Sequence, residues 1–482
     1  MTRGKKLGIL ALLLIVLMAL TLLVIRFAPV TGDEAEETAE TVFTLDADQV
    51  TSLSWTYAGE SITIEKDDES NWSYPADADF PMDATYPDEM VQALTEIQAE
   101  KTIEEPEDLD QYGLSDGGSC TITVEADQTY TLTLGDETGL GGQRYLTTGD
   151  GKVYLVEESL LTTFQHSLLD LVQMETLPDM SELSSLTIQA GQGTLTIDHK
   201  ENSGLTYSDL YTWFWNQDGE ETALDTELTR ELTDAVTGLT WSGCAAYDAT
   251  EEQLSAYGLL KPSATITVHY TESSQVATNE TDEEGQTVYE TKETARTLTL
   301  ELGEYDGETC FVRLAGSAMV YRVDSSFADR ILAAKGTDLL PQQVLNLDWT
   351  QVTGVDVTVE GATDTLTKKT ETETDEDGNE TEQYVYQLNG KTVEVTDCFD
   401  RIQDLEPTGS DAGATPGETL LTLTIHQNSE KWPEVTLTFS AYDSSTALVT
   451  LNGESRLLVD REDVDSIAEA LQEALSTASA DA

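Results

Sequence analysis

Apolar and polar residues alternate along several stretches of the chain, and elsewhere apolar residues recur every three or four positions. Alternation at every second position is typical of a β-strand with one buried face, and Cys120, Ile122 and Val124 follow it. Spacing of three to four predicts amphipathic helices, as at 90–97 and 224–239. Because isolated helices interrupt runs of strands, the pattern predicts an α+β fold with antiparallel sheets.

The predicted elements repeat along the chain. Tyr112-Gly113-Leu114 and Tyr257-Gly258-Leu259 each follow an acidic stretch and precede an alternating strand. Glycine permits a turn that is closed to other residues, so we interpret each triplet as a turn anchored to a core. Further matching pairs follow in the same order. They are Leu132-Thr133-Leu134-Gly135 with Leu300-Glu301-Leu302-Gly303, and 153–157 with 320–324, while Trp72 and Trp215 match upstream.

A third, divergent copy lacks the triplet but keeps alternating strands at 355–359 and 421–425, with a final helix at 464–471. We therefore predict about three tandem related units of antiparallel sheet plus amphipathic helices. Their predicted bounds are 43–178, 179–340 and 341–482. Two acidic, Thr-rich insertions, 271–295 in the second unit and 368–383 in the third, contain turn residues and are predicted to form hairpins or mobile loops.

The segment from Leu7 to Ile25 is apolar and uncharged, which is long enough for a helix to cross a bilayer. Arg3, Lys5 and Lys6 precede it, so the N-terminus is expected in the cytoplasm and the body outside. We predict a cytoplasmic tip and single-pass transmembrane anchor at 1–30, an acidic linker at 31–42, and localisation at the cell membrane. A cleaved signal peptide is the alternative, although the apolar run is long for one.

The charge balance restricts the possible partners. The chain has a formal net charge of −68, from 92 acidic and 24 basic residues. Such a surface repels nucleic-acid phosphates, so no nucleic-acid partner is expected. The acidic residues are spread over the whole body, which favours solubility as their role over recognition of a cationic partner.

The cysteines and histidines form no motif with a known spacing. Cys120, Cys244, Cys310 and Cys398 lie far apart, and buried thiols or disulfides both fit their distribution. The histidines are His166, His199, His269 and His426, and none stands in a nucleophile-elbow or zinc-binding context. With so many acidic residues, some carboxylates will always lie at glycosidase spacing, so such pairs carry little information.

Two local patterns resemble binding sites. Glu373, Asp375, Asp377 and Gly378 resemble the start of a Ca²⁺ loop, but Tyr384 stands where the bidentate Glu is required, so a hairpin turn is favoured. Tyr211, Trp213 and Trp215 would share one face of a strand with Phe214 on the other, and core packing is favoured over a stacking platform. We therefore predict no enzyme activity and assign no catalytic, cofactor-binding or metal-binding residue.

These motifs resemble a known family. Trp72, Tyr74 and Pro75, the segment from Leu109 to Leu114, and the Leu-x-Leu-Gly and Val-Tyr-x-Val strands are similar to those of bacterial domain-of-unknown-function family 4340. The resemblance implies an extracytoplasmic accessory role beside ABC-type exporter components of the gliding-motility kind, and it brings no catalytic residues. The expected function is a membrane-tethered binding or scaffold protein with transporter subunits as partners. An extracytoplasmic hydrolase of wall or glycan polymer, and a cell-surface spacer or Ca²⁺-responsive protein, stay open as alternatives.

Overall fold

The computed structural model describes residues 39–480 except 116–117, 140, 282–285, 306 and 375–379. The predicted anchor, Leu7 to Ile25, lies outside the described residues, as does most of the predicted linker. Among the helices that are described, none combines the length and the apolar character needed to cross a membrane.

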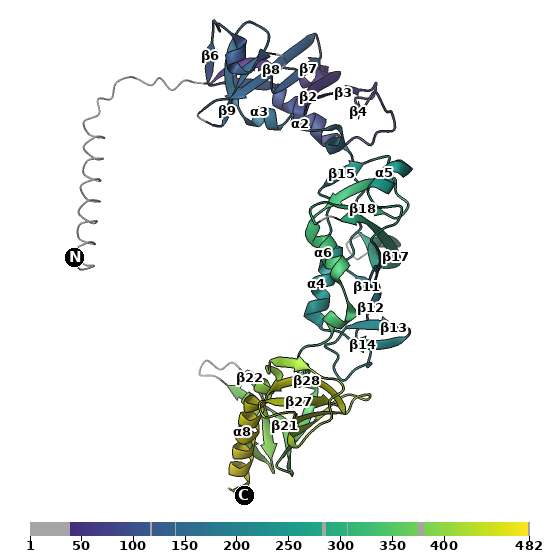
Figure 1. The fold of residues 1–482 in the computed structure, drawn as a ribbon, viewed down its shortest axis with the longest axis vertical. Helices are drawn as coiled ribbons and strands as arrows, with labels where there is room; N and C mark the ends of the chain where they lie inside the picture. Colours follow the sequence, from purple (N-terminus) through teal and green to yellow (C-terminus); the bar gives the residue numbers. More distant parts are fainter. Residues whose placement is uncertain are drawn as a thin grey trace, which may run out of the picture. The chain divides into compact units, whose positions relative to one another are not determined.

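The described chain forms two compact units that divide between Gln173 and Met174. The first unit holds one large antiparallel sheet and the second holds two, with few helices between the strands. The expectation of an α+β chain built mainly on antiparallel sheets is confirmed at this level (Figure 1).

The first unit is an eight-stranded sheet with its apolar face buried. Trp55 is fully buried, and its indole nitrogen donates to the His166 carbonyl oxygen at 2.9 Å. A separate two-stranded sheet pairs β1 (Glu40–Thr44) with β5 (Glu96–Ala99). The large sheet and its helices comprise β2 (Ser52–Tyr57), β3 (Glu60–Lys66), β4 (Trp72–Ser73), α2 (Thr85–Leu94), β6 (Lys101–Ile103), β7 (Cys120–Glu125), β8 (Thr129–Glu137), β9 (Gln143–Thr147), β10 (Val153–Glu157) and α3 (Ser159–Thr162).

The second unit contains two nine-stranded sheets. The first of them comprises β11 (Leu183–Ala190), β12 (Gly193–His199), β13 (Trp213–Gln217), β14 (Glu220–Ala223), α4 (Thr226–Thr237), β15 (Gly243–Ala246), α5 (Glu251–Ala256), β16 (Ala264–Thr281), β17 (Thr287–Tyr305), β18 (Cys310–Leu314), β19 (Val320–Val323) and α6 (Ser325–Ala333). The other comprises β20 (Val352–Val359), β21 (Ala362–Thr374), β22 (Glu380–Leu388), β23 (Lys391–Val393), α7 (Thr396–Gln403), β24 (Pro407–Ser410), β25 (Thr419–Gln427), β26 (Glu434–Ala441), β27 (Thr446–Leu451), β28 (Glu454–Asp460) and α8 (Arg461–Ala480).

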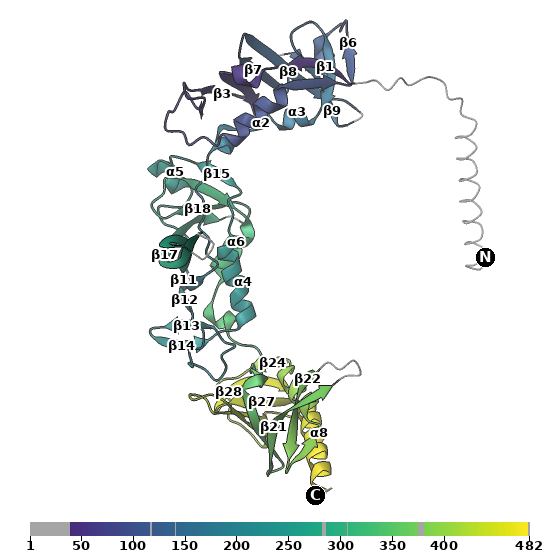
Figure 2. The ribbon, with the colours of Figure 1, turned by 180° about the vertical axis from the view of Figure 1, so that it is seen from behind.

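The three large sheets share one strand order. Counted in chain order within each sheet, the two nine-stranded sheets both read 4-3-2-1-6-7-8-9-5, and the eight-stranded sheet reads the same without its fourth strand. In the nine-stranded sheets a helix follows the fourth strand and another follows the ninth, and the two contact each other, α4 with α6 and α7 with α8. Figure 2 shows α4 and α6 together on one side of their sheet. The shared order supports a repeated architecture.

The two acidic insertions are paired strands. β16 and β17 stay in register from Thr271 with Ala295 to Ala277 with Tyr289. β21 and β22 pair from Lys368 with Tyr386 onward. Both insertions therefore form hairpins, and the connecting residues 282–285 and 375–379 lie outside the described residues.

Each Tyr-Gly-Leu triplet packs against the Leu-x-Leu-Gly strand of its own copy. Gly113 and Gly258 have φ of +65° and +72°, a left-handed conformation that favours glycine. Leu114 and Leu259 are buried beneath the turn. A side chain at Gly303 would collide with the carbonyl oxygen of Tyr257, and Gly135 meets Tyr112 in the same way. The triplets therefore have a structural role in the two copies that carry them.

All four cysteines are buried thiols rather than disulfides. Burial raises the pKa of Cys310 to about 12, and it also raises the pKa of Cys120 and Cys398. The thiolate is the reactive form, and the Cys310 thiol is almost entirely protonated at pH 8, whereas roughly a quarter of an ordinary thiol is ionised there.

We expect a disulfide-exchange reagent such as DTNB to label almost none of the cysteines of the folded protein at pH 8. In guanidinium chloride, without reductant, it should label all four. Rapid labelling of the folded protein, or fewer than four thiols after unfolding, would contradict buried thiols.

A candidate ligand-binding cavity

A cavity of about 1020 Å³ lies within the second compact unit. Its walls come from segments far apart in the sequence: 205–211, β14, 337–342, β24 and the hairpin that joins β27 to β28. Ligand pockets in proteins typically measure about 300–1,000 Å³, so the cavity is large enough for a small organic molecule or a short peptide.

The segment before β13 forms one wall of the cavity, and its tyrosines are buried among core residues of the last sheet. Tyr207 and Tyr211 are 7% and 2% exposed, and both belong to the hydrophobic core of that sheet. The segment is also held by hydrogen bonds: Gln427 Nε2 donates to the Tyr207 carbonyl oxygen at 2.9 Å, and Trp432 Nε1 donates to the Gly204 carbonyl oxygen at 3.2 Å. These contacts connect the cavity wall to the sheet that carries Arg456.

The two tyrosine hydroxyls meet at the cavity. Their oxygens lie 3.4 Å apart, and the Tyr207 hydroxyl accepts a hydrogen bond from the Asn346 backbone N–H at 3.3 Å. Burial raises the pKa of Tyr211 far above its ordinary value, and Tyr207 adds to this, whereas the positive charge of Arg456 opposes it. The Tyr211 phenol therefore stays neutral at physiological pH.

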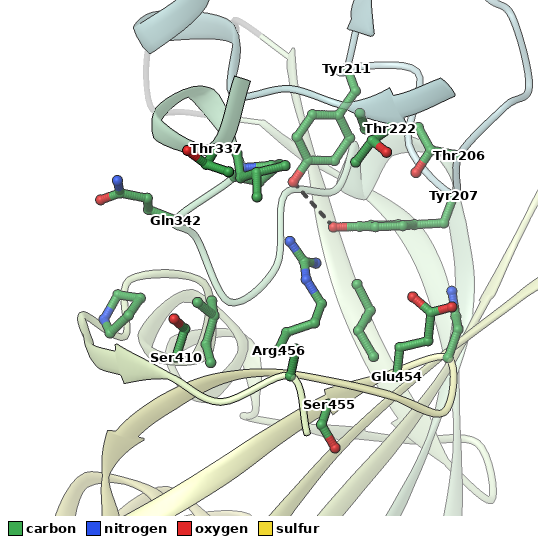
Figure 3. A pocket seen from close by; sticks show the side chains of 18 of the residues that line it. Thr206, Tyr207, Tyr211, Thr222, Thr337, Gln342, Ser410, Glu454, Ser455 and Arg456 are labelled. Carbon is green, nitrogen blue, oxygen red and sulfur yellow. Dashed lines mark hydrogen bonds between the residues drawn. The ribbon is translucent and has the colours of Figure 1, made fainter. Parts of the chain in front are cut away.

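Arg456 is the most unusual residue of the cavity. Its guanidinium points toward the hydroxyls of Tyr207 and Tyr211 (Figure 3). Every other arginine in the described chain makes an ion pair or hydrogen bond with a described residue, whereas Arg456 makes neither. In a chain with 92 acidic residues, an arginine that bonds no described residue is unexpected.

The rest of the lining is mainly uncharged. Arg456 and Glu454 are the only charged residues among those that line the cavity, and the structure records no ion pair between them. The other lining residues supply hydroxyl groups and apolar surface, including Thr222, Thr408, Ser410, Leu205, Leu340 and Trp432. The cavity is therefore close to neutral within a strongly acidic chain.

Two sheet edges border the cavity. β14 is the first strand of its sheet and β24 is the last strand of the other. Among the described residues, β14 pairs only with β13 and β24 pairs only with β28. An unpaired edge presents backbone N–H and C=O groups that can bond to another chain.

The four histidines lie apart from this cavity and from one another. His166 packs edge-to-face on Tyr86 with ring centroids 5.0 Å apart, and His199 lies 5.0 Å from the Trp213 ring. His269 Nδ1 contacts Thr297 Oγ at 2.9 Å. No sequence motif groups these histidines, and the structure does not bring them together.

Within the described part of the chain, His426 is the one histidine with carboxylates at both ring nitrogens. Its Nε2 lies 3.0 Å from Asp356 Oδ2 and its Nδ1 lies 3.5 Å from Glu434 Oε1. Burial disfavours ionisation of Asp356, but hydrogen bonds from Thr365 and His426 outweigh it and lower the Asp356 pKa. The three groups lie on neighbouring strands β20, β25 and β26, where we find a structural role for them in joining the strands.

The aromatic cluster is divided differently from the sequence expectation. β13 begins at Trp213, so Tyr211 does not share a strand face with Trp213 and Trp215 but packs with the other sheet. Trp213 belongs to the core of its own sheet, with Trp215 packed against that core, and Phe214 is fully buried. Core packing of the tryptophans is confirmed, and the position of Tyr211 is corrected.

The possible Ca²⁺ loop cannot be placed, because Asp375, Asp377 and Gly378 lie outside the described residues. Among the residues that are described, no group of three or more histidine, cysteine, aspartate or glutamate side chains is arranged to hold a metal ion.

The repeated antiparallel sheets define a repeat protein, and the ligand-sized cavity within its second unit is a candidate binding site. The chain belongs to the family described as a domain of unknown function, DUF4340, whose sequence model matches residues 72–252 and 213–412. The two matches begin at Trp72 and Trp213, which open the third strand in their respective sheets, and end after the fifth strand of the following sheet. Neither a curated protein nor a solved structure matches the chain.

Proposed function

We propose that the protein is a membrane-tethered, extracytoplasmic binding protein that holds its ligand in this cavity without transforming it. The observation that carries the proposal is Arg456, a cavity-lining guanidinium with no hydrogen bond or ion pair to another described residue. A charge left without a partner in a partly buried site is costly, and a ligand that pairs with it recovers that cost.

The remaining lining supports binding over hydrolysis. A hydrolase of wall or glycan polymer needs two carboxylates flanking the scissile bond, or a nucleophile supported by a base. Glu454 is the sole carboxylate among the residues that line the cavity, and none of these residues is a histidine. Apolar walls with a few convergent polar groups are typical of ligand-binding sites.

The proposal is tested by a substitution that fills part of the cavity with a large side chain. Ser410→Trp adds a large side chain to the wall, while Ser476→Trp places the same side chain on the exposed face of α8, outside the cavity. Native mass spectrometry of protein purified from its own host should find a bound molecule on the wild type and on Ser476→Trp but not on Ser410→Trp. If Ser410→Trp carries the same bound molecule as the wild type, the cavity is not the ligand site.

The cellular setting is part of the same proposal. It is supported by the apolar segment from Leu7 to Ile25 and by the transporter association that the family resemblance implies. In this setting the protein accompanies an ABC-type transporter as an accessory subunit. Co-purification of a transporter subunit from gently solubilised membranes is expected, and recovery of the protein alone in several mild detergents would count against the association.

A further inference from the structure

We propose that the cavity binds a short, extended peptide whose terminal carboxylate pairs with Arg456 and whose backbone adds to the free edge of β24. The inference rests on the proposed function, because it names the chemical class of ligand for the same cavity. It follows from three features: a free strand edge, an arginine without a partner and the size of the cavity.

The edge of β24 is available for strand addition. On one side, Pro407 pairs with Val459, Gly409 with Leu458 and Ser410 with Leu457. On the other side, no described residue forms a hydrogen bond with the backbone of this strand. All four residues of β24 line the cavity. A peptide that enters the cavity in an extended conformation therefore meets unpaired N–H and C=O groups, which is how sheet edges recognise peptides.

Arg456 belongs to the strand on the paired side of β24. Ser410 pairs with Leu457, the residue next to Arg456, so a peptide on the free edge would lie two strand spacings, about 10 Å, from the β28 backbone. The long arginine side chain would meet the terminal carboxylate by extending over β24. Arginine binds a carboxylate through two parallel N–H donors, which fixes the orientation of the ligand as well as holding its charge.

The tyrosine pair adds a neutral donor at the same place. The bond between the Tyr207 and Tyr211 hydroxyls uses one of their two hydroxyl hydrogens. The Tyr207 oxygen also accepts from Asn346 N–H, so the second hydroxyl hydrogen is available to a ligand oxygen. Figure 3 shows these hydroxyls facing the guanidinium across the cavity.

The charges of the lining favour a ligand with one negative group. Arg456 is the single cation of the lining. Glu454 precedes it by two residues on β28 and therefore lies on the same face of that strand. Polyanions such as nucleotides would meet one cation and one carboxylate, besides the field of a chain with net charge −68. A peptide with a single carboxylate meets a matched partner, and its side chains can contact Leu340, Leu451 and Trp432.

The experiment compares two mixtures of N-acetylated tetrapeptides that differ only at the C-terminus, one with free carboxylates and one with amides. Binding to the full-length protein is followed by saturation-transfer NMR and by native mass spectrometry. The free-acid mixture should bind about tenfold more tightly or better, which is typical of a charge-assisted hydrogen bond. Arg456→Gln should abolish this preference, and Arg456→Lys should keep part of it.

Two controls separate the sources of the carboxylate and the folding of the variants. Arg461→Gln changes an arginine outside the cavity lining that bonds Asp465 at 3.4 Å, and it should leave the preference intact. Octanoate and galacturonate present a carboxylate without a peptide backbone. Only the peptides should slow amide hydrogen exchange at Thr408, Gly409 and Ser410. Equal binding of acids and amides, a preference that survives Arg456→Gln, or equal protection by octanoate or galacturonate would overturn the proposal.

The failure of this inference is distinguishable from failure of the binding function. If none of the tetrapeptides binds but Ser410→Trp loses a co-purified molecule, the cavity is a ligand site for another class of ligand. If Ser410→Trp also retains that molecule, both proposals are wrong.

Discussion

Replacing Gly303 with alanine is expected to destabilise the second compact unit by about 3 kcal/mol, at the upper end of what overpacking costs. The added Cβ would lie well inside van der Waals distance of the Tyr257 carbonyl oxygen, with Leu259 Cγ 3.1 Å away. That oxygen accepts a hydrogen bond from Glu304 N–H at 2.8 Å, so the turn cannot withdraw without breaking the bond. The cost arises in the backbone, where no rotamer change can relieve it.

The measurement is guanidinium unfolding of the full-length protein, followed by circular dichroism. Gly191 has open space around its Cα and no left-handed φ, so Gly191→Ala is the matched control and should change the free energy of unfolding little. Gly135→Ala makes the equivalent collision with Tyr112 and should destabilise the first unit instead. A Gly303→Ala protein that unfolds at the wild-type midpoint would show that the close approach is not rigid.

Trp55→Ala is expected to lower the stability of the first unit by about 3–5 kcal/mol, the usual cost of removing a large aromatic side chain from a core. The indole is fully buried, and the change also leaves the His166 carbonyl oxygen without its donor. A partly buried acceptor left unpaired adds to the cost of the void.

Thermal and denaturant unfolding of Trp55→Ala should be compared with Leu109→Ala, in which the truncated side chain is 39% exposed. Leu109→Ala should cost much less because little apolar surface is lost from the interior. Similar losses in the two variants would mean that the first unit tolerates a void under its sheet.

Much of the fold could be predicted from the sequence, because alternation and three-to-four spacing report directly which face of an element is buried. The strand at Cys120, Ile122 and Val124 and the helix spanning Leu228 to Val236 both lie where the pattern indicates. The third copy was found without its triplet, since strands β25 and β26 kept their alternation. Local pattern is sufficient where each side chain faces its own core.

The register between strands could not be predicted from the local sequence pattern. The spacing matches Trp72 with Trp215, but β4 pairs Trp72 with Lys66 whereas β13 pairs Trp213 with His199. The equivalent of Trp72 is therefore Trp213. Two tryptophans separated by one residue offer the same local signal, and only the pairing across the sheet decides between them.

The cavity could not be predicted for a different reason. Tyr207, Ser410 and Arg456 come from three loops or edges with no shared period and no motif spacing. Arg456 became noticeable only once the other described arginines were seen to have hydrogen-bond or ion-pair partners. Such a site is defined by what a residue does not contact, which a sequence does not record.

The third copy illustrates how neighbouring positions depend on each other. Pairing places Gly135, Gly303 and Ser440 at the same point of their sheets, directly after Leu134, Leu302 and Phe439. The first two copies need glycine there because the triplet's Tyr carbonyl occupies the space. The third copy has no triplet, and there a serine side chain fits and is buried.

The strand order also determines when, during synthesis, the binding site can come into being. β24 is made well before β28, its sole pairing partner among the described strands, and β28 also supplies Arg456. A ribosome adds residues from the N-terminus at about 5–20 per second, so both edges of β24 stay unpaired for several seconds until β28 has been synthesised. The nascent chain is therefore exposed to mispairing at this strand, and it acquires competence for its ligand only after β28 has joined the sheet.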